Sequence, residues 1–156
     1  MATRLEKGAP APTFTLDDES GSPVSLSDFA GQNVIVYFYP AASTPGCTTE
    51  ACDFRDNINS LKSAGYQVLG VSKDAPEALR RFKDEQGLNF PLLSDPGLAV
   101  HEAYGAYGEK NSYGRIVTGT IRSTFVVDGE GAVVLPLYNV KATGHVASLR
   151  KKLALD

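Results

Sequence analysis

The sequence predicts an α/β fold in which a central mixed β-sheet is covered by helices on both faces. In the first half of the chain, apolar runs of strand length alternate with segments of helical period, which is the pattern of parallel strand–helix units. Later, the turn Asp128-Gly129-Glu130-Gly131 separates two apolar runs and is a hairpin signature, so antiparallel strands are expected as well. With 156 residues, of which 42% are apolar and 21% charged, we expect one domain over residues 1–156.

The first predicted elements lead to a buried central strand. Short strands are expected at 14–16 and 24–25, and a turn follows over 26–31. The continuous apolar run from Val34 to Tyr39 predicts a strand that is buried on both faces, as at the centre of a parallel sheet.

A helix is predicted directly after this strand. Thr44 offers a capping hydroxyl and Pro45 occupies the first helical position, a pairing typical of a helix start. Gly65 supplies the stop. The apolar residues that share one face of this helix are Ala51, Phe54, Ile58 and Leu61.

The remaining elements complete the sheet and its helical layers. Strands are predicted at 68–72, 120–127 and 132–138, and helices from Pro76 to Gly87 and at 146–155. The helix at Pro76 is expected to turn Ala75, Leu79 and Phe82 inward. Parallel units followed by an antiparallel hairpin and a terminal helix indicate a thioredoxin-like fold.

Charge and hydropathy exclude several classes of function. The net charge is -3 and the pI is near 5.4, so the chain has no general basic field for nucleic acid. Its one compact basic run, Arg150-Lys151-Lys152, is expected to complement the C-terminal end of a helix. The N-terminus does not resemble a signal peptide, and no segment reaches the ~18 apolar residues of a membrane span. We therefore expect a cytoplasmic protein whose two cysteines are reactive thiols.

Cys47 is the candidate nucleophile. It lies about three residues past the expected helix cap, where free backbone N–H groups and the helix dipole favour an anion. A thiol in this position is expected to have a pKa below the ~8.5 of a free cysteine. Most free cysteines are inert core residues, but this one follows a strand-to-helix turn and has a second cysteine nearby.

The spacing between Cys47 and Cys52 restricts how the two can react. Five helical residues separate their α-carbons by roughly 8.6 Å, whereas disulfides require about 4.4 to 6.8 Å. The spacing therefore argues against a permanent disulfide between the two cysteines. It does not match the Cys-x-x-Cys motif of dithiol oxidoreductases, and together with His101 and His145 the cysteines do not have the spacing of a zinc site. It is compatible with a cycle in which the first thiol is oxidised and the second captures it when the helix opens.

These residues resemble the active-site segment of the peroxiredoxins. The pattern is Pro40-x-x-x-Thr44-x-x-Cys47 followed by Thr-x-Glu-x-Cys ending at Cys52, and it is most similar to the bacterioferritin-comigratory-protein or PrxQ branch. The likeness extends from residue 8 to the terminal helix and includes the segment from Arg122 to Asp128. Ala41 departs from the pattern, because relatives often carry lysine there; we expect a change in local charge only.

The resemblance implies a thioredoxin-dependent peroxidase that needs no metal or other cofactor. Cys47 would attack a hydroperoxide, Cys52 would resolve the sulfenic acid, and thioredoxin or a similar dithiol would reduce the disulfide. Arg122, the Thr44 hydroxyl and the N–H of Cys47 would stabilise the transition state, and Pro40 would shield the thiolate. Taken alone, an arginine in the strand 120–127 would more commonly reach solvent.

Several questions stay open at the level of sequence. A thioredoxin-like protein disulfide reductase and a non-enzymatic redox sensor or holdase are alternative functions, and the protein could be a monomer or a homodimer. Glu50 could orient an arginine or merely favour the helix start. His101 and His145 are expected to be ordinary surface or core residues. The Gly-rich segment Tyr104 to Gly119 predicts a mobile loop whose tyrosines could form a rim for substrate or pack beneath it.

Overall fold

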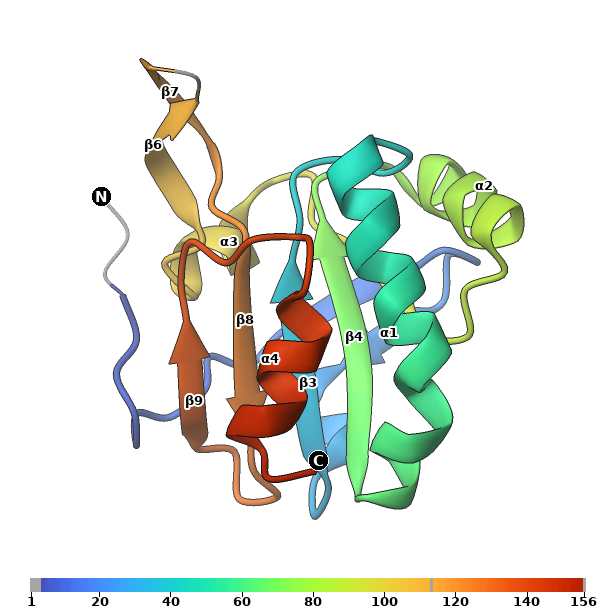
Figure 1. Ribbon diagram of the computed structural model, residues 1–156, viewed down its shortest axis with the longest axis vertical. Coiled ribbons are helices and arrows are strands. Elements are labelled where there is room, and N and C mark those ends of the chain that lie inside the picture. Colours follow the sequence, from blue (N-terminus) through green and yellow to red (C-terminus); the bar gives the residue numbers. More distant parts are fainter. Residues whose placement is uncertain (1–3, 113, 156) are drawn as a thin grey trace.

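A seven-stranded mixed sheet forms the centre of the protein. The computed structural model describes residues 4–112 and 114–155. The order of the strands is β2-β1-β5-β4-β3-β8-β9, in which β3, β4 and β5 are parallel and the other pairs are antiparallel (Figure 1). The strands are β1 (Thr15–Asp18), β2 (Pro23–Ser25), β3 (Asn33–Phe38), β4 (Tyr66–Ser72), β5 (Leu92–Ser94), β8 (Ser123–Val127) and β9 (Val133–Leu137).

Helices cover both faces of the sheet, as predicted, but they are divided unequally. The three longer helices, α1 (Pro45–Ser63), α2 (Pro76–Gln86) and α4 (His145–Lys152), contribute to one apolar core. The opposite face packs against the short α3 (Ala99–Ala103), a 3-10 helix at Leu26–Phe29 and the N-terminal segment. Figure 1 shows α1 and α4 side by side in front of the central strands.

Strand β3 contributes side chains to both cores, because successive side chains point to opposite faces of the sheet. Ile35 and Tyr37 belong to the core under α1, whereas Val34, Val36 and Phe38 belong to the opposite core. All five are at most 1% exposed, which confirms the predicted central strand. The ring of Tyr37 stacks on Phe54 of α1 with centroids 4.6 Å apart, so this contact fixes the helix over the sheet.

The segment predicted as a mobile loop is largely a hairpin. Strands β6 (Tyr107–Ser112) and β7 (Arg115–Thr120) pair antiparallel over six residues each and form a separate two-stranded sheet that projects from the body (Figure 1). Tyr104 does not form a rim, because it is fully buried and its hydroxyl donates to the carbonyl of Pro12. Tyr113 lies outside the described residues.

Other predicted elements differ in detail. The hairpin turn at 128–131 joins β8 and β9 as predicted, with the N–H of Asp128 donating to the carbonyl of Ala132. Ala75 is the exposed residue that precedes α2, so its predicted inward position is wrong. Among residues 4–112 and 114–155, no helix is both long and apolar enough to cross a membrane.

Candidate active site

The strand-to-helix connection after β3 places Cys47 in the first turn of α1. Pro40 is half-buried at the end of the strand, and the connection turns through Ser43, whose φ of 63° is left-handed. Helix α1 begins at Pro45 as predicted, and Cys47 is 1% exposed. The site therefore holds a nearly buried thiol beside the unpaired N–H groups of a helix start.

Thr44 precedes the helix as predicted, but its hydroxyl does not cap it. The side-chain oxygen instead donates to the carbonyl of Ala41 at 2.8 Å, within the connection that leads to the helix. The backbone carbonyl of Thr44 accepts from the N–H of Thr48 at 2.8 Å and so starts the helical ladder. The prediction of a side-chain cap is wrong, since the hydroxyl stabilises the tight turn rather than a helical N–H.

Arg122 contacts Cys47 although the two residues are 75 positions apart in the sequence. It lies between β7 and β8 rather than inside a strand, because β8 begins only at Ser123. Its Nη2 lies 3.4 Å from the Cys47 sulfur, and its Nη1 donates to Glu50 Oε1 at 2.6 Å. Although burial works against the charged form, Glu50 and Cys47 raise the pKa of Arg122, so the guanidinium remains a cation in the site.

Glu50 is the site residue that sequence reasoning left undecided. It lies one turn after Cys47 on α1, is fully buried, and forms an ion pair with Arg122. Burial raises the pKa of Glu50 to about 7, even though Arg122 opposes that shift. Its second oxygen, Oε2, has no hydrogen-bond partner among the described residues. The signal in the sequence was the three-residue spacing from Cys47, which puts both side chains on one helix face.

Cys52 lies on the same helix but in different surroundings. Both cysteines are free, and both belong to the intact α1. Cys52 is partly exposed, and its thiol donates to Gln86 Oε1 at the end of α2 at 3.5 Å. Arg122 contacts Cys47, not Cys52, so the two thiols differ in burial and in electrostatic environment.

The two histidines are core residues. His101 is fully buried and pairs with Asp95 through Nδ1 at 2.7 Å, while His145 Nε2 bonds to Thr124 Oγ1 at 2.8 Å. Burial, assisted by Arg122 and Lys152, lowers the pKa of His145 to about 4. Among the residues that the structure describes, no three His, Cys, Asp or Glu side chains lie close enough together to hold a metal ion.

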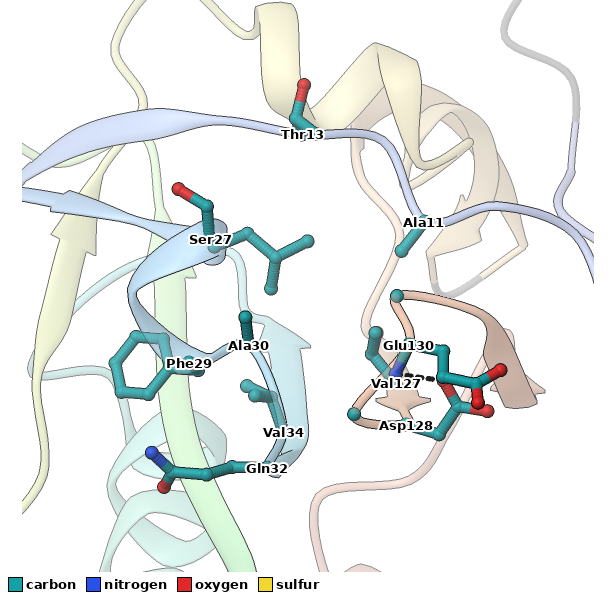
Figure 2. Close-up of a pocket in the computed structure, with 13 residues that line it drawn as sticks. Ala11, Thr13, Ser27, Phe29, Ala30, Gln32, Val34, Val127, Asp128 and Glu130 are labelled. Carbon is teal, nitrogen blue, oxygen red and sulfur yellow. Dashed lines mark hydrogen bonds between the residues drawn. The ribbon is translucent and has the colours of Figure 1, made fainter.

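A pocket of about 270 Å³ lies apart from this site. Apolar side chains of Leu26, Phe29, Val34 and Val127 line it beside the turn 128–131 (Figure 2). The pocket opens where β3 begins, whereas Cys47 follows the end of that strand. None of the predicted site residues lines it.

Comparison with known proteins identifies the family. Residues 7–135 match the AhpC/TSA family. A putative peroxiredoxin of Mycobacterium tuberculosis is 61% identical over 98% of both chains, and peroxiredoxin Bcp of Escherichia coli K12 is 47% identical over 90% of both chains.

Solved structures agree with this assignment. A Xylella fastidiosa PrxQ mutant superposes with a TM-score of 0.90 at 30% identity and 98% coverage of both chains. The bacterioferritin comigratory protein of Xanthomonas campestris gives a TM-score of 0.84 at 39% identity, covering 91% of this chain and 90% of that one. These neighbours are peroxiredoxins with the thioredoxin fold, which confirms the predicted fold class. The chain therefore belongs to the AhpC/TSA family and, within it, to the peroxiredoxins of the Bcp and PrxQ kind.

Proposed function

We propose that this protein is a thioredoxin-dependent peroxidase that reduces hydrogen peroxide and organic hydroperoxides through Cys47. The observation that carries the proposal is the contact between Arg122 and the buried Cys47 sulfur at a helix start. The cation and the helix dipole both favour a thiolate, which is the nucleophilic form of cysteine. Membership of the peroxiredoxin family supports a thiol peroxidase as the general activity.

In the first step, the Cys47 thiolate attacks the terminal oxygen of the hydroperoxide. An S–O bond forms, the O–O bond breaks, and its electron pair leaves with the departing oxygen, which takes a proton to become water or alcohol. Arg122 and the N–H of Cys47 would stabilise the charge that develops on the oxygens. Because the Thr44 proton is already donated to Ala41, the Thr44 oxygen is suited to accept a hydrogen bond from the peroxide. Pro40 would shield the sulfur from bulk water.

In the second step, Cys52 attacks the sulfenic sulfur of Cys47. A disulfide forms and water leaves, so both cysteines have together supplied the two electrons that the peroxide consumed. A dithiol such as thioredoxin then reduces the disulfide and is itself oxidised. The free, partly exposed Cys52 on the same helix supports this assignment. No metal or other cofactor is required by this chemistry.

A coupled assay tests the proposed function. The protein is mixed with hydrogen peroxide, thioredoxin, thioredoxin reductase and NADPH, and consumption of NADPH is followed. Sustained turnover that is abolished by Cys47→Ser is the expected result. Reduction of a protein disulfide without peroxide turnover would favour a disulfide reductase instead, and oxidation that stops after one equivalent would favour a redox sensor or holdase.

The remaining predictions from sequence stay predictions. They are a single domain over residues 1–156, a cytoplasmic location, and a monomeric or homodimeric state. The net charge of -3 supports the expectation that nucleic acid is not a partner.

A further inference from the structure

The β6–β7 hairpin brings a lysine to the neighbourhood of the site. Figure 1 shows the hairpin at the same end of the sheet as the start of α1. Lys110 of β6 lies opposite Val117 of β7, and its ammonium donates to the carbonyl of Thr120 at 2.7 Å. Thr120 is two residues before Arg122, so this bond fixes the ammonium beside the segment that carries the arginine.

The surroundings of Lys110 differ from those of a solvent-exposed lysine. The side chain is half-buried, and an added Cβ on Gly119 would lie 3.5 Å from its Cε. Burial, Arg122 and Lys73 lower the pKa of Lys110, whereas Cys47 acts in the opposite direction. The bond to the Thr120 carbonyl holds the ammonium beside the segment of Arg122, whose guanidinium contacts Cys47, so the charges of both groups act on it.

Charge balance gives this lysine a function. Arg122 contacts both Cys47 and Glu50, so with Glu50 ionised and Cys47 as thiolate one cation faces two anions. Lys110 has no carboxylate partner within ion-pair distance among residues 4–112 and 114–155, and its bond to the Thr120 carbonyl leaves its charge uncompensated. A second cation would balance the second anion.

We propose that Lys110 is a positioning residue for peroxide reduction, supplying the second positive charge that stabilises the Cys47 thiolate. The inference rests on the proposed function, because it concerns the same thiolate. It makes the β6–β7 hairpin part of the active site. The charged and titratable groups near the thiolate are Glu50 of its own helix, Arg122, Lys110, Tyr37 of β3 and Tyr39 directly after β3, and Lys73 after β4 acts on Lys110.

Three variants test the proposal in a Cys52→Ser background, in which Cys47 is the only thiol. Lys110→Met removes the charge, Lys110→Arg keeps it, and Arg115→Met removes an exposed cation from the start of β7 as a matched control. The thiolate is titrated by its ultraviolet absorbance and by its rate of alkylation with iodoacetamide against pH. The rate of reaction with hydrogen peroxide is measured by stopped flow.

We expect Lys110→Met to move the midpoint of the thiolate titration up by about half a unit to one unit, and to slow peroxide attack below that midpoint about threefold to tenfold. Lys110→Arg should restore both values, and Arg115→Met should change neither. An unchanged midpoint in Lys110→Met would overturn the proposal. Equal losses in Lys110→Met and Lys110→Arg would reduce Lys110 to a structural role, and an equal shift in Arg115→Met would indicate a general charge effect; either result also overturns it.

Alkylation separates this proposal from the proposed function, because it does not require peroxide. If the parent protein failed to react with peroxide while Lys110→Met still shifted the alkylation profile, the peroxidase assignment would fail and the charge effect would stand. Circular dichroism of each variant checks that the hairpin variants are folded.

Discussion

At the residue scale, the guanidinium of Arg122 contacts both acidic groups of the site, Cys47 and Glu50. Cys47 and Glu50 are three residues apart, so they lie on one face of α1 and one arginine can reach both. The geometry makes the two acidic groups compete for the same cation. Charge on Glu50 therefore affects how strongly Arg122 stabilises the thiolate.

Replacement of Arg122 should separate its electrostatic role from simple packing. In Arg122→Met the apolar stem is largely kept but the thiolate loses its cation, so we expect peroxide attack to slow by a factor of at least about ten. Stopped-flow measurement of the first turnover checks this, with the exposed Arg80→Met as a control. Equal first-turnover rates in the two variants would show that Arg122 does not assist the chemistry.

Glu50 should leave a signature in the pH dependence of stability. Its pKa is about 7 in the folded protein against a reference value of 4.5, so the folded state holds this proton more tightly than the unfolded state. Its contribution to stability is complete below pH 4.5 and is lost as pH rises towards and through 7. In Glu50→Gln that loss is absent, so from about pH 5 to 8 the variant should gain on the order of 1–3 kcal/mol relative to the parent.

Denaturant unfolding at a series of pH values measures this difference. Glu102→Gln, at an exposed position of α3, is the control and should follow the parent profile. Parallel profiles for the parent and Glu50→Gln would show that Glu50 is ionised in the same pH range in both states.

Residues in local motifs could be predicted, whereas those that depend on distant contacts could not. Cys47 was identifiable because Thr44, Pro45 and the preceding strand specify a helix start within a few residues. The role of Glu50 was not, because its partner is 72 residues away and only the folded sheet brings the two together. The sequence predicts a side-chain cap at Thr44 because a local motif cannot show that this hydroxyl donates to the Ala41 carbonyl instead.

At the scale of elements, α1 must hold Cys47 in its first turn in the reduced protein and must open locally for Cys47 to bond to Cys52. An intact helix holds the two cysteine α-carbons roughly 8.6 Å apart, which exceeds the span of a disulfide. Thr48 and Thr49 are weak helix formers, and the Thr49 hydroxyl bonds back to the Pro45 carbonyl at 3.1 Å. From Phe54 onward the helix is held, because Phe54 stacks on Tyr37 and Arg55 Nη1 donates to the Gln86 carbonyl at 2.6 Å.

Oxidation should therefore unwind only the beginning of α1. We predict faster amide exchange from Cys47 to about residue 54 in the oxidised protein, with exchange unchanged in β3 and β4. Hydrogen–deuterium exchange with mass spectrometry compares the reduced and oxidised forms, and Cys52→Ser treated in the same way is the control. Protection that persists from Cys47 to Cys52 in an intramolecularly oxidised protein would contradict this motion.

The β6–β7 hairpin could not be predicted from the sequence. Its segment is rich in glycine, and its apolar residues Ile116 and Val117 are exposed, so they do not mark a buried face. Pairing between the two strands holds it in place instead, together with long-range bonds such as that from the N–H of Ile121 to the carbonyl of Ala106. By contrast, α1 was predicted well because Phe54, Ile58 and Leu61 repeat at helical spacing and are all buried.

At the scale of the whole molecule, the sheet positions the site by ending several strands at one edge. The parallel strand β3 leads into the turn before Cys47, and the antiparallel β8 begins just after Arg122, so both residues meet at the same end of neighbouring strands. Alternating elements predicted the mixed sheet and its helical layers. The order of the strands was not predictable, because it depends on pairings such as β1 with β5 that join distant segments.

Acid should weaken this assembly through His145, which packs α4 against the sheet. Its pKa is about 4 in the folded protein against 6.5 for the free side chain, so the unfolded state binds the proton first as pH falls. The contribution of His145 to stability should therefore decline between pH 6.5 and 4, by on the order of 1–3 kcal/mol, while that of Glu50 rises over the same range. Relative to the parent, His145→Gln should therefore gain stability as pH falls from 6.5 to 4, as thermal or denaturant unfolding would show. A constant difference between His145→Gln and the parent across this range would assign the acid sensitivity to other groups.

The proposed mechanism depends on which sulfur reacts first and on where the second bond forms. The most direct measurement treats the parent protein, Cys47→Ser and Cys52→Ser with one equivalent of hydrogen peroxide and maps the products by mass spectrometry. We predict an intramolecular Cys47–Cys52 disulfide in the parent, a trappable sulfenic acid on Cys47 in Cys52→Ser, and no rapid reaction in Cys47→Ser. Rapid oxidation of Cys47→Ser, or a parent protein whose cysteines link only between chains, would contradict it.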